Sequence, residues 1–462
     1  MIVKGGTIVT TADQFKADVV IKNGVIVGLE KKAVPKSGTE VLDAKGMYVF
    51  PGGIDPHVHL QLPFCGTISK DDFENGTKAG ACGGLTTLID FAIQTKGESM
   101  KSAVKARRKE ADGKVCVDYA LHVGITDWKN KRTQKELKDI IAGGIPSFKM
   151  FMIYASQGWM ADDADLYGAL LESAKYGGTI GVHAENVYLT DTLTEQYMKD
   201  GSWKKYGAYA HFLTRPNFTE SEAVQRAITM AEAAKGQLYI VHMSTKEAMY
   251  AVIEGKQRGV NVIAETCPQY LLLTADKFKD KKTGHYYATC PPIRTKEDNT
   301  DLWWGLSCGA VETMGTDTCT FDSKQKAMWK GKFSQIPFGM PGVETFMPTM
   351  YTHGVRKKRL TLQQFVTLTS TNTARLFGLY PKKGLIAVGS DADICVFDPK
   401  KEVTLNPKKM QTNCDWSPYN KMKLKGYPHV TISRGKIVAK DGKFVGKVGH
   451  GQFVARKAGG TL

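Results

Sequence analysis

The chain has 462 residues, of which 42% are hydrophobic and 24% charged, the balance of a folded globular protein with a sizeable core. It contains no membrane-span or signal-peptide pattern, and its nine scattered cysteines include no Cys-x-x-Cys pair, so we expect a cytoplasmic protein with reduced thiols and no disulfide framework. The formal net charge of +17 is spread over short basic clusters, which favours a solvated basic surface over a nucleic-acid partner.

Residues 1–50 carry short strand patterns separated by turn residues. Strands are expected at Ile2–Lys4, Asp18–Ile21 and Val25–Leu29, and the last two flank Asn23-Gly24, a dipeptide typical of tight hairpin turns. Residues 1–50 are therefore predicted to form the first part of a small β-sandwich domain.

From Met47 onward the pattern changes to apolar runs that alternate with helices. Buried parallel strands read as continuous hydrophobic runs, so eight such runs predict an α/β fold, a (β/α)8 TIM-like barrel over residues 51–380. A doubly wound open sheet is the alternative, although no Gly-x-Gly-x-x-Gly follows the first strand. The runs are Tyr48–Phe50 leading to His57, Leu85–Ala92, Val115–Ile125, Ser147–Met152, Thr179–His183, Gln237–His242, Asn261–Glu265 and Val311–Asp317.

Helical and then β patterns complete the chain. Amphipathic helices are expected at Asp71–Cys82, Asp162–Lys175, Glu220–Ala234, Thr245–Arg258 and Leu360–Leu379. Strands follow in residues 389–397 and 430–444, the latter with an Asp441-Gly442 turn, so residues 381–462 are predicted to complete the β-sandwich. The basic tail after about Gly449 is expected to be poorly ordered or to pack on a neighbouring subunit.

His57 and His59 stand two residues apart at the end of the first run. Positions i and i+2 of an extended chain share one face, so both imidazoles can converge on one metal ion, although two histidines in a surface loop have the same spacing. The active site of a barrel forms at the carboxyl ends of its strands, and the later runs place more candidates there. These candidates are Lys149, His183, His242 and Asp317.

Lys149 is unusual because it lies within an apolar strand, Ser147–Met152. Burial pushes an amine toward its neutral form, and a neutral amine can add carbon dioxide to give a carbamate. The carbamate oxygens can bridge two cations. The alternative is a lysine whose long stem carries its charged head to solvent.

Six sequence blocks, taken together, resemble the hydantoinase/dihydropyrimidinase branch of the amidohydrolase superfamily. The resemblance runs over nearly the whole chain and extends to residues 339–344 and 375–379. The blocks are His57-Val58-His59, Phe148-Lys149, Gly181–Asn186, Ile240–Ser244, Glu265–Tyr270 and Gly315-Thr316-Asp317.

The resemblance implies a centre of two divalent metal ions, usually zinc, with N6-carboxylysine at Lys149. One ion would be held by His57, His59, the lysine carbamate and Asp317, and the other by the same carbamate, His183 and His242. The centre would activate water for attack on the ring amide of a cyclic ureide, with Asp317 moving the proton and the Tyr154 hydroxyl stabilising the oxyanion.

The chain departs from the family pattern around the predicted pocket. Thr318 replaces the usual His after the metal-binding aspartate and is followed by Cys319, Cys290 replaces the Ser before Pro-Pro, and Phe338 replaces an Asn. The resemblance implies that Cys290 and Phe338 contact the substrate mainly through backbone groups, that the Phe338 side chain reshapes the pocket, and that the loops with Phe64 and Trp159 frame the exocyclic group. These changes leave the identity of the substrate open.

The predicted activity is ring opening of 5-substituted hydantoins or 5,6-dihydropyrimidines to N-carbamoyl amino acids, by a homo-oligomer, a tetramer or a dimer. The alternatives are another cyclic ureide or amide such as allantoin, and a carboxylated substrate that would pair with Arg294 on its loop. A non-catalytic structural relative that lacks metal ligands is a third possibility, but every ligand position is filled.

Overall fold

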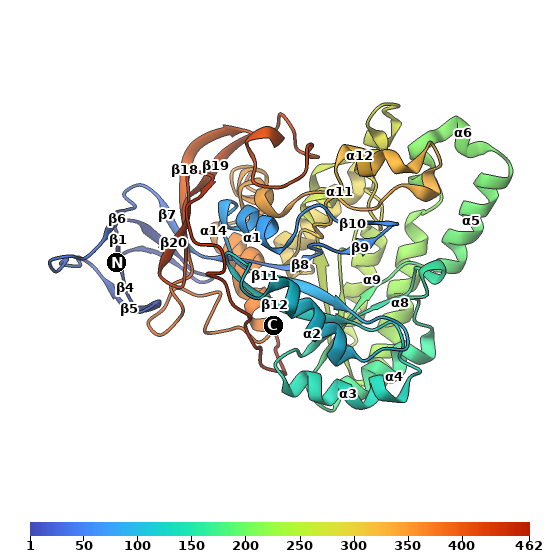
Figure 1. The fold of residues 1–462 in the computed structure, drawn as a ribbon, viewed down its shortest axis with the longest axis horizontal. Helices are drawn as coiled ribbons and strands as arrows, with labels where there is room; N and C mark the ends of the chain where they lie inside the picture. The colour runs from blue at the N-terminus through green and yellow to red at the C-terminus, as the bar shows by residue number, and fades with distance from the viewer.

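The computed structural model describes residues 1–462 and contains a barrel of parallel strands flanked at one end by two sheets of the chain termini (Figure 1). Neighbouring barrel strands follow the order of the sequence, and a parallel bridge between Val58 and Thr318 joins the first strand to the segment after the last. A doubly wound sheet reverses its order at a switch point, so the barrel prediction is confirmed. The strands are β8 (Gly53–Val58), β11 (Leu85–Ile93), β12 (Asp118–Gly124), β13 (Ser147–Phe151), β14 (Thr179–His183), β15 (Gln237–Ile240), β16 (Val262–Thr266) and β17 (Thr313–Met314).

Most helices around the barrel begin directly after a side chain that caps them. Asp72 accepts a hydrogen bond from the backbone of Asn75, and Asp162 and Thr295 form reciprocal capping boxes. The four predicted helices between the strands are confirmed to within three residues at their ends. The helices are α1 (Phe73–Cys82), α2 (Met100–Ala111), α3 (Lys131–Ala142), α4 (Asp163–Ala174), α8 (Asn217–Ala234), α9 (Lys246–Gln257) and α11 (Lys296–Cys308).

Two predicted elements differ from the structure. The helix expected at Leu360–Leu379 is divided by a π-helical turn, Thr367–Thr371, into α14 (Leu362–Val366) and α15 (Asn372–Leu376). The run Tyr48–Phe50 belongs to β7 (Tyr48–Pro51), which pairs with strands of the terminal sheet rather than with the barrel. The chain passes between the two at Gly52, where a Cβ atom would lie 2.1 Å from the Thr86 hydroxyl.

The terminal domain combines strands from both ends of the chain, as predicted. Its larger sheet has the order β21-β20-β19-β18-β7-β2-β3 and its smaller sheet β5-β4-β1-β6. Val3, Val19 and Val49 pack with Ile394 and Val430 in one core, which joins the termini. The strands are β1 (Ile2–Lys4), β2 (Thr7–Val9), β3 (Gln14–Lys16), β4 (Asp18–Lys22), β5 (Val25–Glu30), β6 (Val41–Asp43), β18 (Ile394–Thr404), β19 (Lys423–Ser433), β20 (Lys436–Lys440) and β21 (Lys443–Phe444).

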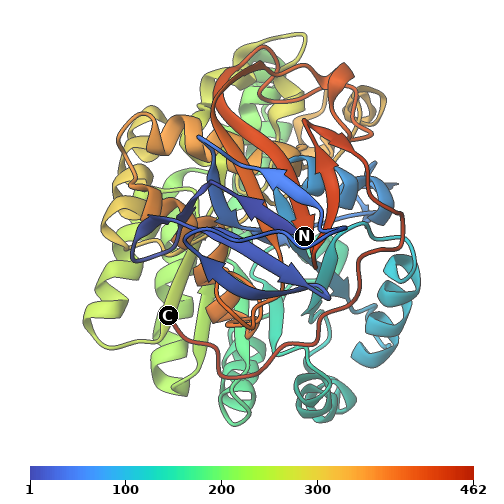
Figure 2. The same cartoon turned by 90° about the vertical axis from the view of Figure 1, so that its left-hand side faces the viewer.

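The tail after Gly449 packs on its own barrel, which corrects the expectation of a poorly ordered tail, whereas packing on a neighbouring subunit stays a prediction. It runs across the amino-terminal ends of the strands toward the C-terminus, as Figure 2 shows. The backbone N–H of Val454 donates to Tyr119 (2.8 Å), that of Arg456 to Gly144 (2.9 Å) and that of Gly459 to Gly177 (2.8 Å). A basic, glycine-containing segment is held because its backbone groups find partners at exposed strand and helix ends.

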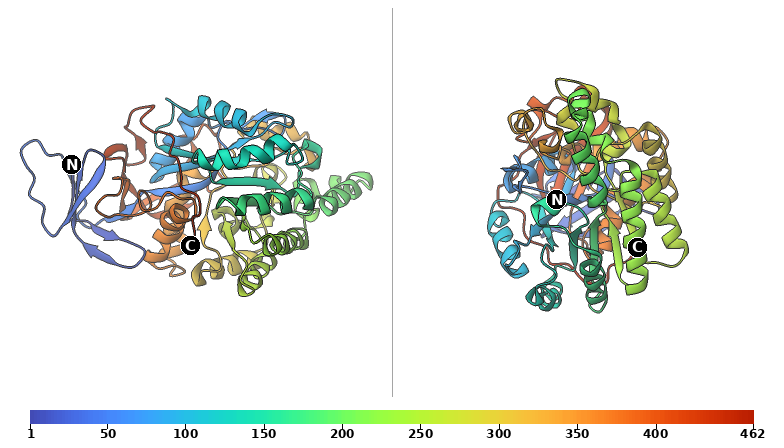
Figure 3. Two further views of the ribbon diagram at one scale, coloured as in Figure 1. Left: turned by 90° about the horizontal axis from the view of Figure 1, so that it is seen from below. Right: turned by 90° about the vertical axis from the view of Figure 1, so that its right-hand side faces the viewer.

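Helices α5 (Val187–Lys199) and α6 (Ser202–Tyr206) protrude from the end of the molecule opposite the terminal domain (Figure 3). They follow β14 in the chain and lie beyond the ring of barrel helices. No helix of the protein combines the length and the apolar character that a membrane span requires.

Candidate metal centre and substrate pocket

The predicted ligands come from strands far apart in the sequence and meet at the carboxyl end of the barrel. Parallel strands in a closed barrel all end at the same rim, so residues at their last positions face one another. His57 lies in β8 and His59 just after it, Lys149 lies in β13, and His183 ends β14. His242 and Asp317 stand two and three residues after β15 and β17.

One corner of this group is formed by His57, His59 and Asp317. The Oδ1 atom of Asp317 lies 3.4 Å from Nε2 of His57 and 3.3 Å from Nε2 of His59. Two ligands that are each about 2.0–2.1 Å from one ion in a tetrahedral site are separated by roughly 3.3 Å. The spacing of this corner therefore fits a single bound cation.

The other corner is formed by Lys149, His242 and His183. Lys149 Nζ lies 3.5 Å from Nε2 of His242, and the rings of His242 and His183 are 4.5 Å apart. Lys149 is 2% exposed and forms no ion pair, and burial lowers its pKa to about 8. A lysine of this kind has an accessible neutral form, which carbamate formation requires.

Buried carboxylates orient two of the imidazoles. Glu265 Oε1 accepts from His57 Nδ1 at 2.7 Å, and Glu185 Oε2 accepts from His183 Nε2 at 2.7 Å. Each hydrogen bond leaves the other ring nitrogen with its lone pair free, as in carboxylate–histidine–metal arrangements. We did not predict these roles from the sequence, although Glu265 ends a predicted strand and Glu185 lies two residues after His183.

Burial favours the neutral form of three of the imidazoles. Burial lowers the pKa of His57, His183 and His242, and the neighbouring Lys149 amine adds to this for each of them. Burial opposes the ionisation of Asp317, but His57 and His59 beside it leave its pKa lower than usual. Neutral imidazoles and an ionised carboxylate are the protonation states that bind metal.

His57 Nε2, which faces Asp317, is a buried nitrogen without a hydrogen-bond partner. The unpartnered nitrogens of His59 and His242 are their Nδ1 atoms, whereas their Nε2 atoms approach Asp317 and Lys149. A buried polar atom without a partner costs roughly 1–3 kcal/mol. The donor set and the unpartnered His57 Nε2 between Glu265 and Asp317 therefore fit a metal centre.

Three of the candidate residues have left-handed backbone conformations. The φ angles are 65° at Tyr154, 39° at His242 and 51° at Asp317. Such conformations cost of order 1–3 kcal/mol in residues other than glycine and cluster at functional sites. Each of the three terminates or follows a strand, so the turn points its side chain back over the barrel.

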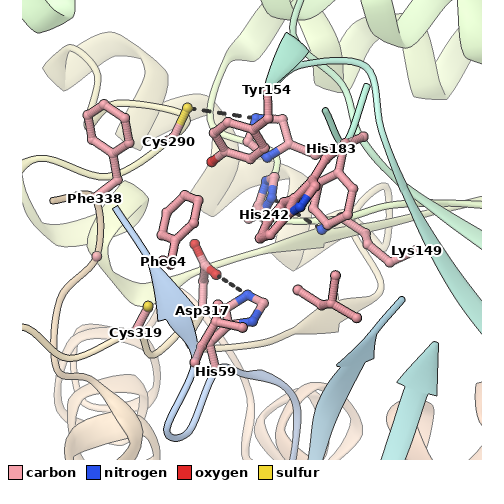
Figure 4. A pocket seen from close by; sticks show the side chains of 15 residues that line it. His59, Phe64, Lys149, Tyr154, His183, His242, Cys290, Asp317, Cys319 and Phe338 are labelled. Atoms are coloured by element: carbon pink, nitrogen blue, oxygen red, sulfur yellow. Dashed lines mark hydrogen bonds and ion pairs between the residues drawn. The ribbon is translucent and has the colours of Figure 1, made fainter. Parts of the chain in front are cut away.

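A pocket opens above the candidate ligands (Figure 4). The predicted substrate contacts Phe64, Tyr154, Trp159, Cys290 and Phe338 all line it. The Phe64 and Trp159 rings stack at 5.6 Å, and Tyr154 meets both rings edge-on, at 5.4 and 6.0 Å. This wall of the pocket is aromatic.

The residues that depart from the family pattern take different positions. Thr318 turns away from the pocket, since its hydroxyl is hydrogen-bonded to Thr316 (2.7 Å), whereas Cys319 lines the pocket. Phe338 stacks on His211 with ring centroids 4.8 Å apart. The Cys290 thiol donates to Glu185 Oε2 at 3.1 Å.

Arg294 does not line the pocket, which removes the support it lent to a carboxylated substrate. Its side chain is fully buried behind the site, where Nε donates to Ser244 (2.9 Å) and the guanidinium pairs with Glu220 at 3.6 Å. The arginine nearest to the pocket wall is Arg215, which we did not predict, and its Nε lies 3.8 Å from Glu185 Oε1.

Comparisons with known proteins agree with this geometry. The model of the amidohydrolase family matches residues 48–438. A D-hydantoinase of Geobacillus stearothermophilus is 43% identical over 100% of this chain and 97% of its own, and a dihydropyrimidinase of Rattus norvegicus is 39% identical over 99% and 89%. The crystal structure of a dihydropyrimidinase from Brevibacillus agri has 39% identity and superposes with a TM-score of 0.97 over 100% of this chain and 99% of that one.

Proposed function

The chain belongs to the amidohydrolase family, in its hydantoinase/dihydropyrimidinase branch, and on this premise we propose that it opens the ring of 5-substituted hydantoins or 5,6-dihydropyrimidines. The products are N-carbamoyl amino acids. It is a hydrolase of cyclic amides, and the site supplies the groups that such a reaction needs.

The six residues at the carboxyl end of the barrel would hold two divalent ions, which we propose to be zinc. His57, His59 and Asp317 would bind one, His183 and His242 the other, and a carboxylated Lys149 would bridge them. When bound, the ions supply Lewis acidity and a nucleophilic water near neutral pH. Six ligands exceed what one four-coordinate zinc uses.

Two side chains at the pocket handle the proton and the charge. Asp317, kept ionised by His57 and His59, would accept the proton of the attacking water and return it to the leaving ring nitrogen. Tyr154 is partly buried, and burial followed by the neighbouring Cys290 raises its pKa well above the usual value. A hydroxyl that stays protonated can donate to the oxyanion that develops on the ring carbonyl.

The lining of the pocket favours a bulky apolar substituent at position 5. Apart from the proposed ligands, its side chains carry no charge and no amide group. Allantoin has a ureido group and a dihydroorotate-like acid has a carboxylate, and neither group finds a matching partner there. The stacked Phe64 and Trp159 rings suit an aryl or alkyl group.

The proposal extends to assembly and compartment. Exposed aromatic side chains on four helices, Tyr188, Phe218, Tyr250 and Trp304, support a homo-oligomer, a tetramer or a dimer, which sedimentation of the active protein tests. All nine cysteines are free, which supports a reducing compartment such as the cytoplasm.

The observation that carries the proposal is the convergence of the ligand set beneath an aromatic pocket. Metal-replete protein is incubated with phenylhydantoin, hydantoin, dihydrouracil and allantoin, and carbamoyl products are measured by chromatography. We expect phenylhydantoin to be opened fastest and Asp317→Asn to give almost no product. Elemental analysis should find two ions per chain. Failure to open any of the first three rings would require another substrate class.

A further inference from the structure

Cys290, Glu185 and His183 form a second cluster of possible metal ligands at the wall of the pocket. One ligand atom from each lies within 4.8 Å of the others, and all three residues are buried. The Cys290 side chain faces the His183 ring at the edge of the pocket (Figure 4). Most of the proposed catalytic ligands lie on other strands, and only His183 belongs to both groups.

The separations are close to those of a tetrahedral site. Cys290 Sγ lies 3.1 Å from Glu185 Oε2 and 3.9 Å from His183 Nε2, and Nε2 lies 2.7 Å from Oε2. Zinc with a sulfur ligand at about 2.3 Å and nitrogen or oxygen ligands at about 2.0–2.1 Å would place such atoms roughly 3.3–3.6 Å apart. Side-chain movements of about half an ångström would therefore suffice.

Glu185 has capacity for a further partner. Its Oε1 atom is buried and accepts no hydrogen bond, and the nearest cation is Arg215 Nε at 3.8 Å. The carboxylate is fully buried, so an unused oxygen is costly there. A cation bound through both Glu185 oxygens would satisfy this atom.

We propose that Cys290, Glu185 and His183 bind a third, thiophilic divalent cation, such as zinc in excess or cadmium, and that this ion inhibits the enzyme. A thiolate among nitrogen and oxygen ligands selects zinc and softer ions over magnesium or calcium.

Occupation of this site interferes with the reaction in two ways. Binding would release the Cys290 thiol proton and the His183 Nε2 proton to solvent, so that His183 would hold an ion at each ring nitrogen and its hydrogen bond to Glu185 would be lost. That bond orients an imidazole that would hold one of the catalytic ions, and partners of this kind matter for metal affinity. The ion would also stand on the pocket wall beside Tyr154, where the substrate must bind.

The test uses holoprotein in a Cys308→Ser background, which removes the one fully exposed thiol. Cadmium is titrated while the ultraviolet cadmium–thiolate absorption, the activity and the content of the ions already bound are measured. We expect one equivalent to produce the band and to lower activity in parallel, before any of the other ions is released.

Substitutions identify the residues that produce the cadmium–thiolate absorption band. Cys290→Ser should abolish it and make the remaining activity at least about tenfold less sensitive to excess zinc, and Glu185→Gln should weaken cadmium binding about 10–100-fold. The matched control Cys319→Ser removes another buried pocket thiol and should keep the band. A band that survives Cys290→Ser, or no band while Cys290 is present, overturns the proposal.

A measurement on the unsubstituted chain covers the case in which a variant fails to fold. Cadmium should slow the alkylation of Cys290 by iodoacetamide at least about tenfold, as measured by peptide mass spectrometry, and should leave Cys65 unchanged. Equal alkylation with and without cadmium would contradict the site, whatever substrate the enzyme hydrolyses.

Discussion

Lys149 and Lys383 are both almost fully buried, 2% and 1% exposed, but they lie at opposite ends of the barrel and differ in their partners. Lys383 Nζ pairs with Asp118 (2.8 Å), Asp391 (3.1 Å) and Asp393 (2.5 Å). Lys149 has no carboxylate within ion-pair distance, although the charges of Asp317 and Glu265 partly offset the effect of burial. Burial opposes the charge of both amines, yet the pKa of Lys383 is raised by its three aspartates while that of Lys149 falls to about 8.

The difference shows that the partners of a buried lysine decide its role. Around Lys383 the charges are compensated, and the cluster joins the barrel strand β12 to the terminal domain. Around Lys149 no ion pair compensates the amine, and the nearby His57 Nε2 atom has no hydrogen-bond partner. Unpaired buried groups of this kind are typical of functional sites. The amino-terminal end of the barrel is thus built for stability and the carboxyl end for reaction.

Substitution of Lys149 should have the largest effect on activity at the carboxyl end of the barrel. We expect Lys149→Ala to lose bound metal and to lower activity more than about 10³-fold, because the bridging carbamate cannot form. Added acetate or propionate should restore part of the activity, since a free carboxylate can replace the missing oxygens. Lys149→Arg, which keeps a cation but forms no carbamate, should not be rescued. Full activity of Lys149→Ala would leave the lysine an ordinary structural residue.

Tyr154→Phe tests the carboxyl end of the barrel without changing any of the proposed metal ligands. Loss of one oxyanion donor should lower kcat about 10²–10³-fold while the metal content stays unchanged. Tyr419→Phe removes the hydroxyl of another buried tyrosine outside the pocket and should leave kcat close to wild type. Equal effects of the two substitutions would argue against an oxyanion role for Tyr154.

Lys383→Met should affect stability instead of catalysis. Removing the cation leaves Asp391 and Asp393 without an ion-pair partner and Asp118 with Arg434 alone, so we expect the free energy of unfolding to fall by about 3–5 kcal/mol. Denaturant unfolding measures the loss, and metal content and activity per folded molecule should be retained. A catalytic defect with normal stability would show that the two ends are not separate in function.

Lys326 adds a third buried lysine to the comparison of Lys149 and Lys383, because its amine contacts neither a carboxylate nor a proposed metal ligand. It donates to the carbonyl oxygens of Ala288 (3.2 Å) and Pro337 (2.6 Å), and burial lowers its pKa to about 7 from 10.5. Between these pH values the unfolded chain binds the proton more tightly, so stability should rise with pH by at most about 1.4 kcal/mol per unit. The free energy of unfolding should be measured from pH 7 to 10, and its slope with pH should be smaller in Lys326→Met than in the wild type. An unchanged slope would show that groups other than Lys326 cause the pH dependence.

Local sequence patterns predicted the parts of the molecule whose signals are local. The last seven of the eight apolar runs, the helices predicted at Asp71–Cys82 and Asp162–Lys175, and the turns at Asn23-Gly24 and Asp441-Gly442 lie within a few residues of the elements that form. The predicted ligands meet for the same reason, since residues at the ends of parallel barrel strands share one rim.

Other predictions failed where a segment had a choice of partners. Tyr48–Phe50 is as apolar as a barrel strand, yet it pairs with β18, more than 300 residues away in the sequence. The tail after Gly449 has a composition typical of disorder, but its backbone finds partners along the barrel. Arg294 has the charge for a substrate contact and is buried elsewhere.

Sequence alone therefore specified the barrel, the terminal β domain and the residue types of the metal centre, because strand periodicity and the positions of strand ends are local properties of the chain. Tertiary structure decided which carboxylate orients which histidine and which buried lysine stays unpaired. His57 and Glu265 are 208 positions apart, and Lys383 and Asp118 are 265 apart. The energy of such pairs depends on distance and burial in space, and neither is written in the local order of residues.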